Sequence, residues 1–146
     1  MNNMLRQSFW TTMMLAGAVG LVASCAQMGP MMGSQKVALM GSNEVPPVTT
    51  SASGEASVTI KDDKSVSVSV TVKDMVATAA HIHEAAASAN GPVIVPFTKT
   101  GDNTFAAAPD AKLTDAQYAS YKAGNLYINV HSAKNPGGEV RGQLKP

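Results

Sequence analysis

The sequence predicts an all-β domain, a Greek-key β-sandwich or barrel of about eight strands with one short helix near residues 115–123. Three observations favour this fold class. Residues 65–72, SVSVSVTV, alternate valine with serine or threonine, which is the period of a strand with one buried face. Similar short runs recur along the chain, separated by turns rich in glycine, proline and asparagine. Helical segments do not alternate with these runs, which argues against a parallel sheet.

The expected strands follow one another through the chain. The run 54–60 alternates polar with small or apolar residues, and 61-KDDK-64 indicates the turn of a hairpin with the strand at 65–72. Further strands are expected at 36–40, 76–83, 92–97, 103–107, 126–131 and 139–144.

One helix is predicted at 115–123. Thr114 and Gln117 have the spacing of a capping box, and Leu113 and Tyr118 have the spacing of a hydrophobic staple. We expect this helix to pack on the β domain through its tyrosine face.

Residues 1–24 are predicted to be a secretory signal. Arg6 is the only charged residue before Lys36, and the apolar run that follows it is too short for a membrane-spanning helix. The run ends in 22-VASC-25, which resembles the lipobox of bacterial lipoproteins, where the signal is cut before a lipid-bearing cysteine. We therefore expect Cys25 to be lipidated and to anchor the chain to a membrane. An ordinary cleaved signal with a chance cysteine is the alternative.

The rest of the chain divides into a flexible Met- and Gly-rich tether at 25–35 and one domain at 36–146. Ten of the eleven basic residues remain after Arg6 is removed with the signal, and they balance the ten acidic residues. This balance argues against nucleic acid as a partner. The single cysteine leaves the domain without an intrachain disulfide.

All three histidines lie in two predicted strands: His81 and His83 in the first, and His131 at the end of the second. Residues i and i+2 of a strand point to the same face, so the pair projects side by side. If the two strands are neighbours, the three imidazoles converge, and neutral imidazole suits copper, zinc, iron or nickel. The alternative is that the histidines are hydrogen-bonded scaffold residues without a metal.

Five motifs of this chain occur together and in a fixed order: E-V-P-P, H-I-H, N-G-P, A-G-x-L-Y-x-N-V-H and N-P-G-G-E-x-R-G. In this order they resemble the CHRD domain, first defined in chordin and common in secreted bacterial proteins. The resemblance covers about residues 36–146. The family name implies no reaction.

The paired histidines with a distant third are also similar to copper–zinc superoxide dismutase, an immunoglobulin-like sandwich in which such residues bind copper. This analogy of fold implies a mononuclear copper site at His81, His83 and His131, with zinc as the alternative metal. The chain lacks a fourth histidine that could bridge to a second metal, so a dinuclear dismutase is not implied.

Glu44 and Met40 are candidates for an additional ligand, since a carboxylate and a thioether can both complete a copper site. Glu84 has the opposite strand parity to His83 and should point away from it. Further methionines that could favour Cu(I) are Met28, Met31 and Met32. Glu139 and Arg141 share strand parity, and we expect them to form a structural pair, with Glu44 as the alternative partner of Arg141.

The sequence thus predicts an envelope protein, facing the periplasm and anchored by lipid, that binds or handles a transition metal, copper first. Ala26 after the cysteine favours the outer membrane. The pattern assigns no catalytic residue, and a copper-dependent redox or dismutase-like activity is a narrower version of the same prediction. The alternative is a structural or protein-interaction module of the envelope without a metal, whose protein partner the sequence does not identify.

Overall fold

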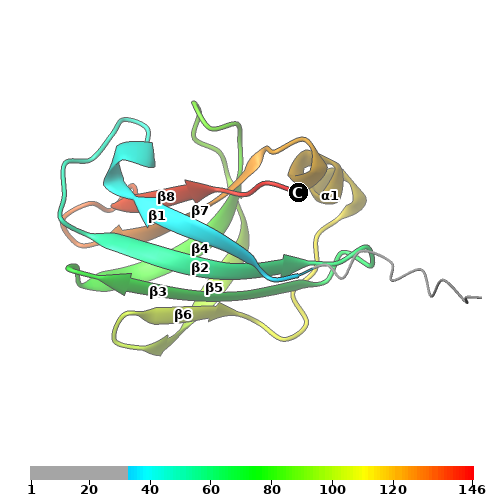
Figure 1. Cartoon of the computed structure of the whole chain (residues 1–146), viewed down its shortest axis with the longest axis horizontal. Helices are drawn as coiled ribbons and strands as arrows, with labels where there is room; N and C mark the ends of the chain where they lie inside the picture. The colour runs from blue at the N-terminus through cyan, green and yellow to red at the C-terminus, as the bar shows by residue number, and fades with distance from the viewer. Residues whose placement is uncertain (1–32) are drawn as a thin grey trace, which may run out of the picture. The chain divides into compact units, whose positions relative to one another are not determined.

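The computed structural model describes residues 33–146, and this part of the chain forms eight strands, one α-helix and one 3-10 turn (Figure 1). The elements are β1 (Gln35–Met40), η1 (Gly41–Asn43), β2 (Ser53–Ile60), β3 (Val66–Lys73), β4 (Ala77–Glu84), β5 (Val93–Gly101), β6 (Thr104–Ala107), α1 (Asp115–Lys122), β7 (Leu126–Ser132) and β8 (Val140–Gln143). The predicted all-β class with one short helix is confirmed.

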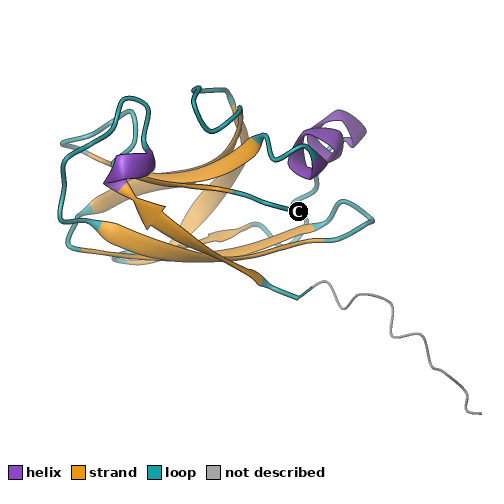
Figure 2. Cartoon of the chain, turned by 45° about the horizontal axis from the view of Figure 1, so that its top comes forward, coloured by secondary structure: helices purple, strands orange, loops and turns teal. Residues whose placement is uncertain are grey.

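The eight strands close into one barrel in the order β1-β2-β3-β6-β5-β4-β7-β8. All neighbours are antiparallel. The connections β3–β4 and β6–β7 each cross to a strand that is not the next neighbour, which makes the topology a Greek key. Figure 2 shows the strands in orange, with helix α1 in purple to one side of them. Of the two architectures predicted, the closed barrel is therefore the one observed.

The core follows directly from the alternation in the sequence. Strand β3 buries every valine and exposes every residue between them. Its neighbour β2 matches this pattern in register, since Val58 pairs with Val68 and Ala56 pairs with Val70. All four of these side chains are at least 96% buried, so the inner faces of the strands fill the barrel with side chains.

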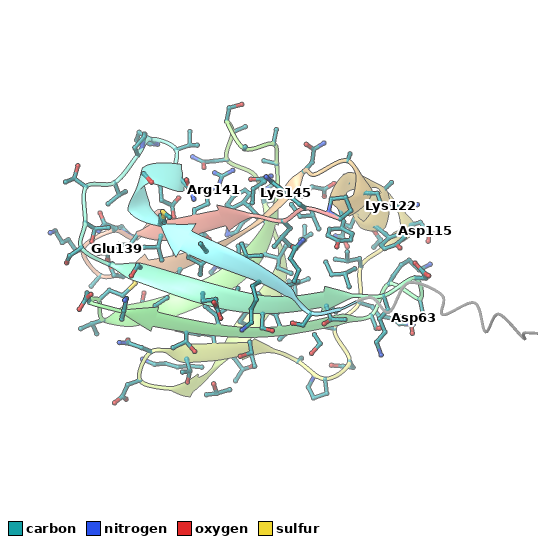
Figure 3. All side chains as sticks on the ribbon, viewed as in Figure 1. Asp63, Asp115, Lys122, Glu139, Arg141 and Lys145 are labelled. Atoms are coloured by element: carbon teal, nitrogen blue, oxygen red, sulfur yellow. The ribbon has the colours of Figure 1, made fainter. Side chains whose placement is uncertain are left out.

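Helix α1 begins where the capping box predicts. The Thr114 hydroxyl accepts the Gln117 backbone N–H at 3.2 Å, and the Gln117 side-chain oxygen accepts the Thr114 backbone N–H at 2.9 Å. Lys64 forms an ion pair with Asp115 in the first turn of the helix at 2.5 Å, and Asp115 is labelled in Figure 3. Within the part of the chain that the structure describes, no helix is long and apolar enough to span a membrane.

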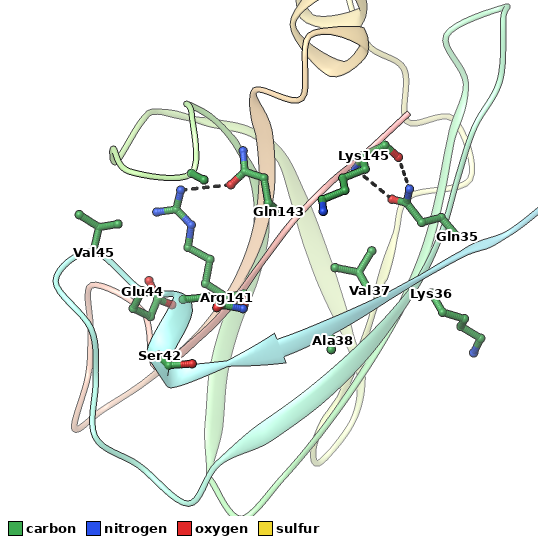
Figure 4. A pocket seen from close by; sticks show the side chains of 12 residues that line it. Gln35, Lys36, Val37, Ala38, Ser42, Glu44, Val45, Arg141, Gln143 and Lys145 are labelled. Atoms are coloured by element: carbon green, nitrogen blue, oxygen red, sulfur yellow. Dashed lines mark hydrogen bonds between the residues drawn. The ribbon is translucent and has the colours of Figure 1, made fainter.

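The barrel closes between its first and last strands through a short seam. Met40 and Arg141 are the paired residues of β1 and β8, and Gly142 lies so near β1 that an added Cβ would be 2.6 Å from the Ala38 carbonyl oxygen. Farther along, the Gln35 side-chain amide donates to the Lys145 carbonyl and accepts its N–H, as a strand neighbour would. A cleft of about 670 Å³ runs along this seam (Figure 4).

Residues 33–146 lie in one compact unit, and the core described above is entirely inside it. We therefore expect residues 33–146 to fold by themselves. The predicted signal at 1–24, Cys25 and the methionines before Gly33 lie outside the described residues.

Candidate metal centre

The three histidines lie on the outer face of the barrel wall formed by β4 and β7. His81 is paired with Asn129 and His83 with Tyr127, while His131 pairs with Ala79. The register is unbroken from Ala79 to Glu84, which keeps these alternate pairs on a common face. The residues between them, Ile82, Ile128 and Val130, are fully buried in the core. The predicted strand parity is therefore confirmed, and the condition for convergence, that the two strands be neighbours, is met.

This placement brings the three imidazoles together. One ring nitrogen from each of His81, His83 and His131 lies within 4.8 Å of the other two. His81 Nδ1 and His131 Nε2 are 3.0 Å apart, and the ring centroids are separated by 4.9–6.0 Å. His83 is buried, whereas His81 and His131 are half-buried. The cluster thus has one inner ring and two rings nearer to solvent.

Backbone carbonyls fix the protonation of two of these rings. The Nδ1–H of His83 donates to the Gly91 carbonyl at 2.9 Å, and that of His131 donates to the Pro136 carbonyl at 3.0 Å. Because a carbonyl can only accept, Nδ1 carries the proton in both rings and Nε2 keeps its lone pair. Protein ligands to metals are oriented by this kind of hydrogen bond on the second ring nitrogen.

The surroundings also keep the rings neutral. Burial, together with the neighbouring His131 and His83, lowers the pKa of His81 to about 4. Burial lowers the pKa of His83 as well, against the Gly91 hydrogen bond that raises it, and burial lowers the pKa of His131. Neutral imidazole is the form that binds metals. In the metal-free protein the His81 Nδ1–H donates to His131 Nε2 at 3.0 Å, since Nδ1 of His131 carries the proton of that ring. A metal held by both atoms would replace this hydrogen bond, and the His81 proton would then sit on Nε2.

The spacing of two of the three ligand nitrogens matches a transition-metal site, whereas a pair as far as 4.8 Å apart would move closer on binding the same ion. With metal–nitrogen bonds of about 2.0–2.1 Å, two ligand nitrogens at about 90° to one another are about 2.9 Å apart, close to the 3.0 Å between His81 Nδ1 and His131 Nε2. His83 Nε2 is buried and receives no hydrogen bond from any residue that the structure describes. A metal ion would satisfy this lone pair, and three protein ligands would leave one coordination position open.

Glu44, one candidate for a further ligand, is buried near the centre but outside the three-histidine group. Burial raises the pKa of its carboxyl to about 7, against the lowering effect of Arg141 and of the Asn129 side chain. Gly138 packs on both neighbours, since a Cβ there would lie 2.5 Å from Glu44 Oε1 and 2.6 Å from Asn129 Nδ2. Asn129 therefore lies next to both Glu44 and His83, and Glu44 reaches the histidine cluster only by way of this side chain.

Met40, the other candidate, lies apart from the cluster. Its side chain is 47% exposed on β1, and the pairing runs from Met40 to Arg141, then to Asn129 and then to His81. Three strand spacings of about 4.8 Å thus separate Met40 from His81. The structure does not bring this thioether to the histidines.

Glu84 and Glu139 both have other partners. Glu84 accepts a hydrogen bond from the Ser120 hydroxyl of α1 at 2.5 Å, on the side away from the cluster, as its parity predicts. Glu139 accepts from Thr50 and Ser132. The predicted pairing of Glu139 with Arg141 is therefore wrong, and Figure 3 labels both residues. The hydroxyls of Thr50 and Ser132 satisfy the Glu139 carboxylate. Arg141 instead donates to the loop between β4 and β5.

Four residues of the centre were not predicted from the sequence as part of it. Two of them, Gly91 and Pro136, supply the carbonyls that accept from the histidine rings. The other two, Tyr127 and Asn129, lie beside the His83 ring. The signal for them was present, because N-G-P and N-P-G-G mark the two turns that carry the carbonyls, and Tyr127 and Asn129 share the strand parity of His131.

A closed antiparallel barrel that presents three neutral histidines from two adjacent strands defines a β-barrel protein with a candidate metal centre. The family model described as CHRD domain matches residues 36–144, most of the chain. The chain therefore belongs to the CHRD-domain family. No curated protein and no solved structure matches it.

Proposed function

We propose that this CHRD domain binds one transition-metal ion through His81, His83 and His131, with copper as the first candidate and zinc as the second. The buried lone pair of His83 Nε2 carries the proposal. It lacks a hydrogen-bond partner among residues 33–146, and it belongs to a ring whose other nitrogen is already held by Gly91. An unsatisfied buried acceptor is costly, and a metal ion would remove that cost.

Copper is favoured by the donor set. Three neutral imidazoles add no negative charge, and nitrogen sites bind Cu(II) more tightly than the other divalent metals of the first row. The same three nitrogens with one open position would also suit zinc. Binding and handling of the ion is the function proposed, and redox chemistry at the open position is a narrower version of it.

The setting of this function is the cell envelope. The proposal rests on the signal-like residues 1–24 and on the lipobox-like Cys25, which would anchor the domain by lipid on the periplasmic side, with the outer membrane favoured by Ala26. The tether at 25–35 would then separate the barrel from the membrane surface.

The test is a titration of residues 33–146, purified without a histidine tag, with Cu(I), Cu(II) and Zn(II). We expect one tight equivalent that His81→Ala and His131→Ala each abolish while the circular dichroism spectrum is kept. Met40→Leu is the matched control, since Met40 lies three strand spacings from His81, and it should bind like the wild type. If none of the three ions binds stoichiometrically, the histidines are scaffold and the domain is a structural or interaction module.

A further inference from the structure

Arg141 is a buried charge that no carboxylate pairs. Its side chain lies on β8 and is 1% exposed, and the two ion pairs among residues 33–146, Lys36–Glu55 and Lys64–Asp115, do not include it. A charge taken out of water is costly unless other polar groups replace the water. The polar partners of the Arg141 guanidinium therefore indicate the role of this residue.

The guanidinium is bound by the loop between β4 and β5. It donates to the carbonyls of Ala86 and Ala89 at 3.0 and 2.9 Å and to the Asn90 side-chain oxygen at 3.1 Å. Figure 4 shows it turned toward this loop and toward Gln143, which accepts at 3.4 Å. A planar guanidinium can hold several acceptors in one fixed arrangement, which a lysine cannot do. Arg141 therefore sets the shape of the loop at 85–91.

The end of this loop holds the inner histidine. Gly91 accepts the Nδ1–H of His83 at 2.9 Å, and its own N–H donates to the Tyr127 hydroxyl at 3.3 Å. The loop also lies close against its own strand, since a Cβ at Gly91 would be 1.9 Å from the Glu84 carbonyl oxygen. A displacement of the loop would thus move the acceptor that fixes His83.

The side chains of Arg141, Tyr127 and His83 also form a stack, which is a second connection between the arginine and the histidine. The Arg141 Cζ lies 3.4 Å from the centroid of the Tyr127 ring, and the Tyr127 ring lies parallel to the His83 ring, with centroids 4.9 Å apart and an interplanar angle of 11°. A guanidinium over an aromatic face is attracted to it. Arg141 therefore reaches His83 by two routes, through the loop and through the tyrosine ring.

We propose that Arg141 is the positioning residue of the metal centre: by binding loop 85–91 and stacking on Tyr127, it holds His83 in the Nδ1–H form with Nε2 free before a metal arrives. The inference deepens the proposed function and rests on it for its effect on metal affinity. Its effect on the His83 ring concerns the metal-free protein and does not depend on metal binding.

The experiment compares residues 33–146 of the wild type with Arg141→Lys, which keeps the charge and removes the fork. Nitrogen chemical shifts of the His83 ring in the metal-free protein should report one Nδ1–H tautomer in the wild type and a mixture in the variant. Titration with Zn(II), and with Cu(II), should show affinity lower by about 10- to 100-fold, the usual effect of losing a residue that orients a ligand.

Two further variants separate positioning from general stability. Val70→Ala removes core volume on β3, away from the histidines, and should leave the tautomer and the metal affinity unchanged. Asn90→Ala removes one acceptor of the guanidinium from an exposed position, so the domain should fold even if Arg141→Lys does not. It should shift the tautomer and the affinity in the same direction as Arg141→Lys, by less.

A single Nδ1–H tautomer in Arg141→Lys and in Asn90→Ala, with wild-type affinity, would overturn the inference. A tautomer shift in these variants, together with no metal binding by the wild type, would support the positioning of His83 and reject the proposed function. The two failures are therefore distinguishable.

Discussion

At the scale of single residues, Asn129 lies between two side chains that both need a partner. Its amide group influences the pKa of the buried Glu44 and that of His83. Glu44 Oε1, His83 Nε2 and Asn129 Oδ1 are buried without hydrogen bonds from the described part of the chain. An unmade buried hydrogen bond costs about 1–3 kcal/mol. Burial raises the pKa of Glu44 to about 7, more than the Arg141 charge and the Asn129 amide lower it, so the neutral carboxyl is the favoured form below that pH.

Glu44 should make the stability of the metal-free domain fall as pH rises. Its pKa is about 7 in the folded state and 4.5 as the ordinary value, so the contribution of its proton is complete below pH 4.5 and is lost as pH approaches 7. Glu44→Gln keeps a neutral amide, and its free energy of unfolding relative to the wild type should rise over this window, by at most about 3 kcal/mol. Urea denaturation at pH 4.5, 6 and 8 measures it.

The three histidines act in the opposite direction in both proteins. Their pKa values are lowered on folding, so their contribution to stability is present above pH 6.5 and is lost as pH falls below that. The histidines contribute equally to Glu44→Gln and to the wild type, so their contribution cancels when the free energy of unfolding of one protein is subtracted from that of the other. A difference that stays constant from pH 4.5 to 8 would show that Glu44 is not protonated near neutral pH.

At the scale of elements, alternation predicted the strands well because one face of each strand fills the barrel. It was weakest at their ends. Strand β5 was expected to stop at residue 97 and continues to Gly101, since Lys99 and Phe105 pair in the hairpin with β6. Strand β8 is shorter than expected because only Val140–Gln143 pairs with its neighbours.

The candidate site was also predictable only in part, because strand alternation fixes side-chain directions but not the course of loops. Strand parity fixes the direction of His81, His83 and His131, and therefore the cluster. Loops fix the partners of the rings, and their course depends on long-range contacts such as that of Arg141 with Ala89, which no local pattern shows. The neighbours across the barrel wall depend on the strand order, so the distance from Met40 to the cluster could not be read from the chain either.

The turn before β8 should be intolerant of a side chain at one of its two glycines. Gly138 has φ +130, a region that favours glycine, and a Cβ there would meet Glu44 and Asn129 within 2.6 Å. Gly138→Ala should lower the free energy of unfolding by about 1–3 kcal/mol or more. Gly137→Ala is the matched control, because its Cβ would meet nothing within 4 Å. Equal denaturation midpoints for the two variants would contradict this account.

The capping box makes a measurable contribution to helix α1. Thr114→Ala removes the acceptor of the Gln117 N–H and should lower the free energy of unfolding by about 1 kcal/mol. Thr114→Ser keeps the hydroxyl and should stay close to the wild type. Thermal denaturation of the three proteins under one condition compares them, and a loss as large in the serine variant would mean that the methyl group matters instead of the cap.

At the scale of the whole molecule, the closed barrel provides the rigidity on which the centre depends. Its order places β4 and β7 side by side although more than 40 residues of chain separate His83 from Leu126. Strands that are paired on both sides fix ligand directions before a metal binds. Metal binding should then stabilise the fold without reshaping it.

A bound metal should raise the thermal stability of the entire barrel. An ion that binds only the folded state adds about 2.7 kcal/mol at a free concentration 100 times its Kd. The melting temperature of residues 33–146 should therefore rise with added Cu(II) or Zn(II), and that of His131→Ala should not. A similar rise in both proteins would indicate binding elsewhere.

The Gln35 side chain, near the start of the barrel unit, contacts Lys145, near its end. The two ends of the barrel unit lie next to each other, so a short glycine-rich linker from Pro146 to Gly33 would join them without stretching. New termini could then be opened at the exposed tip between Gly101 and Asp102. Such a circular permutant should fold to the same barrel, because the seam, the core and the three histidines depend on which strands touch and not on which strand comes first.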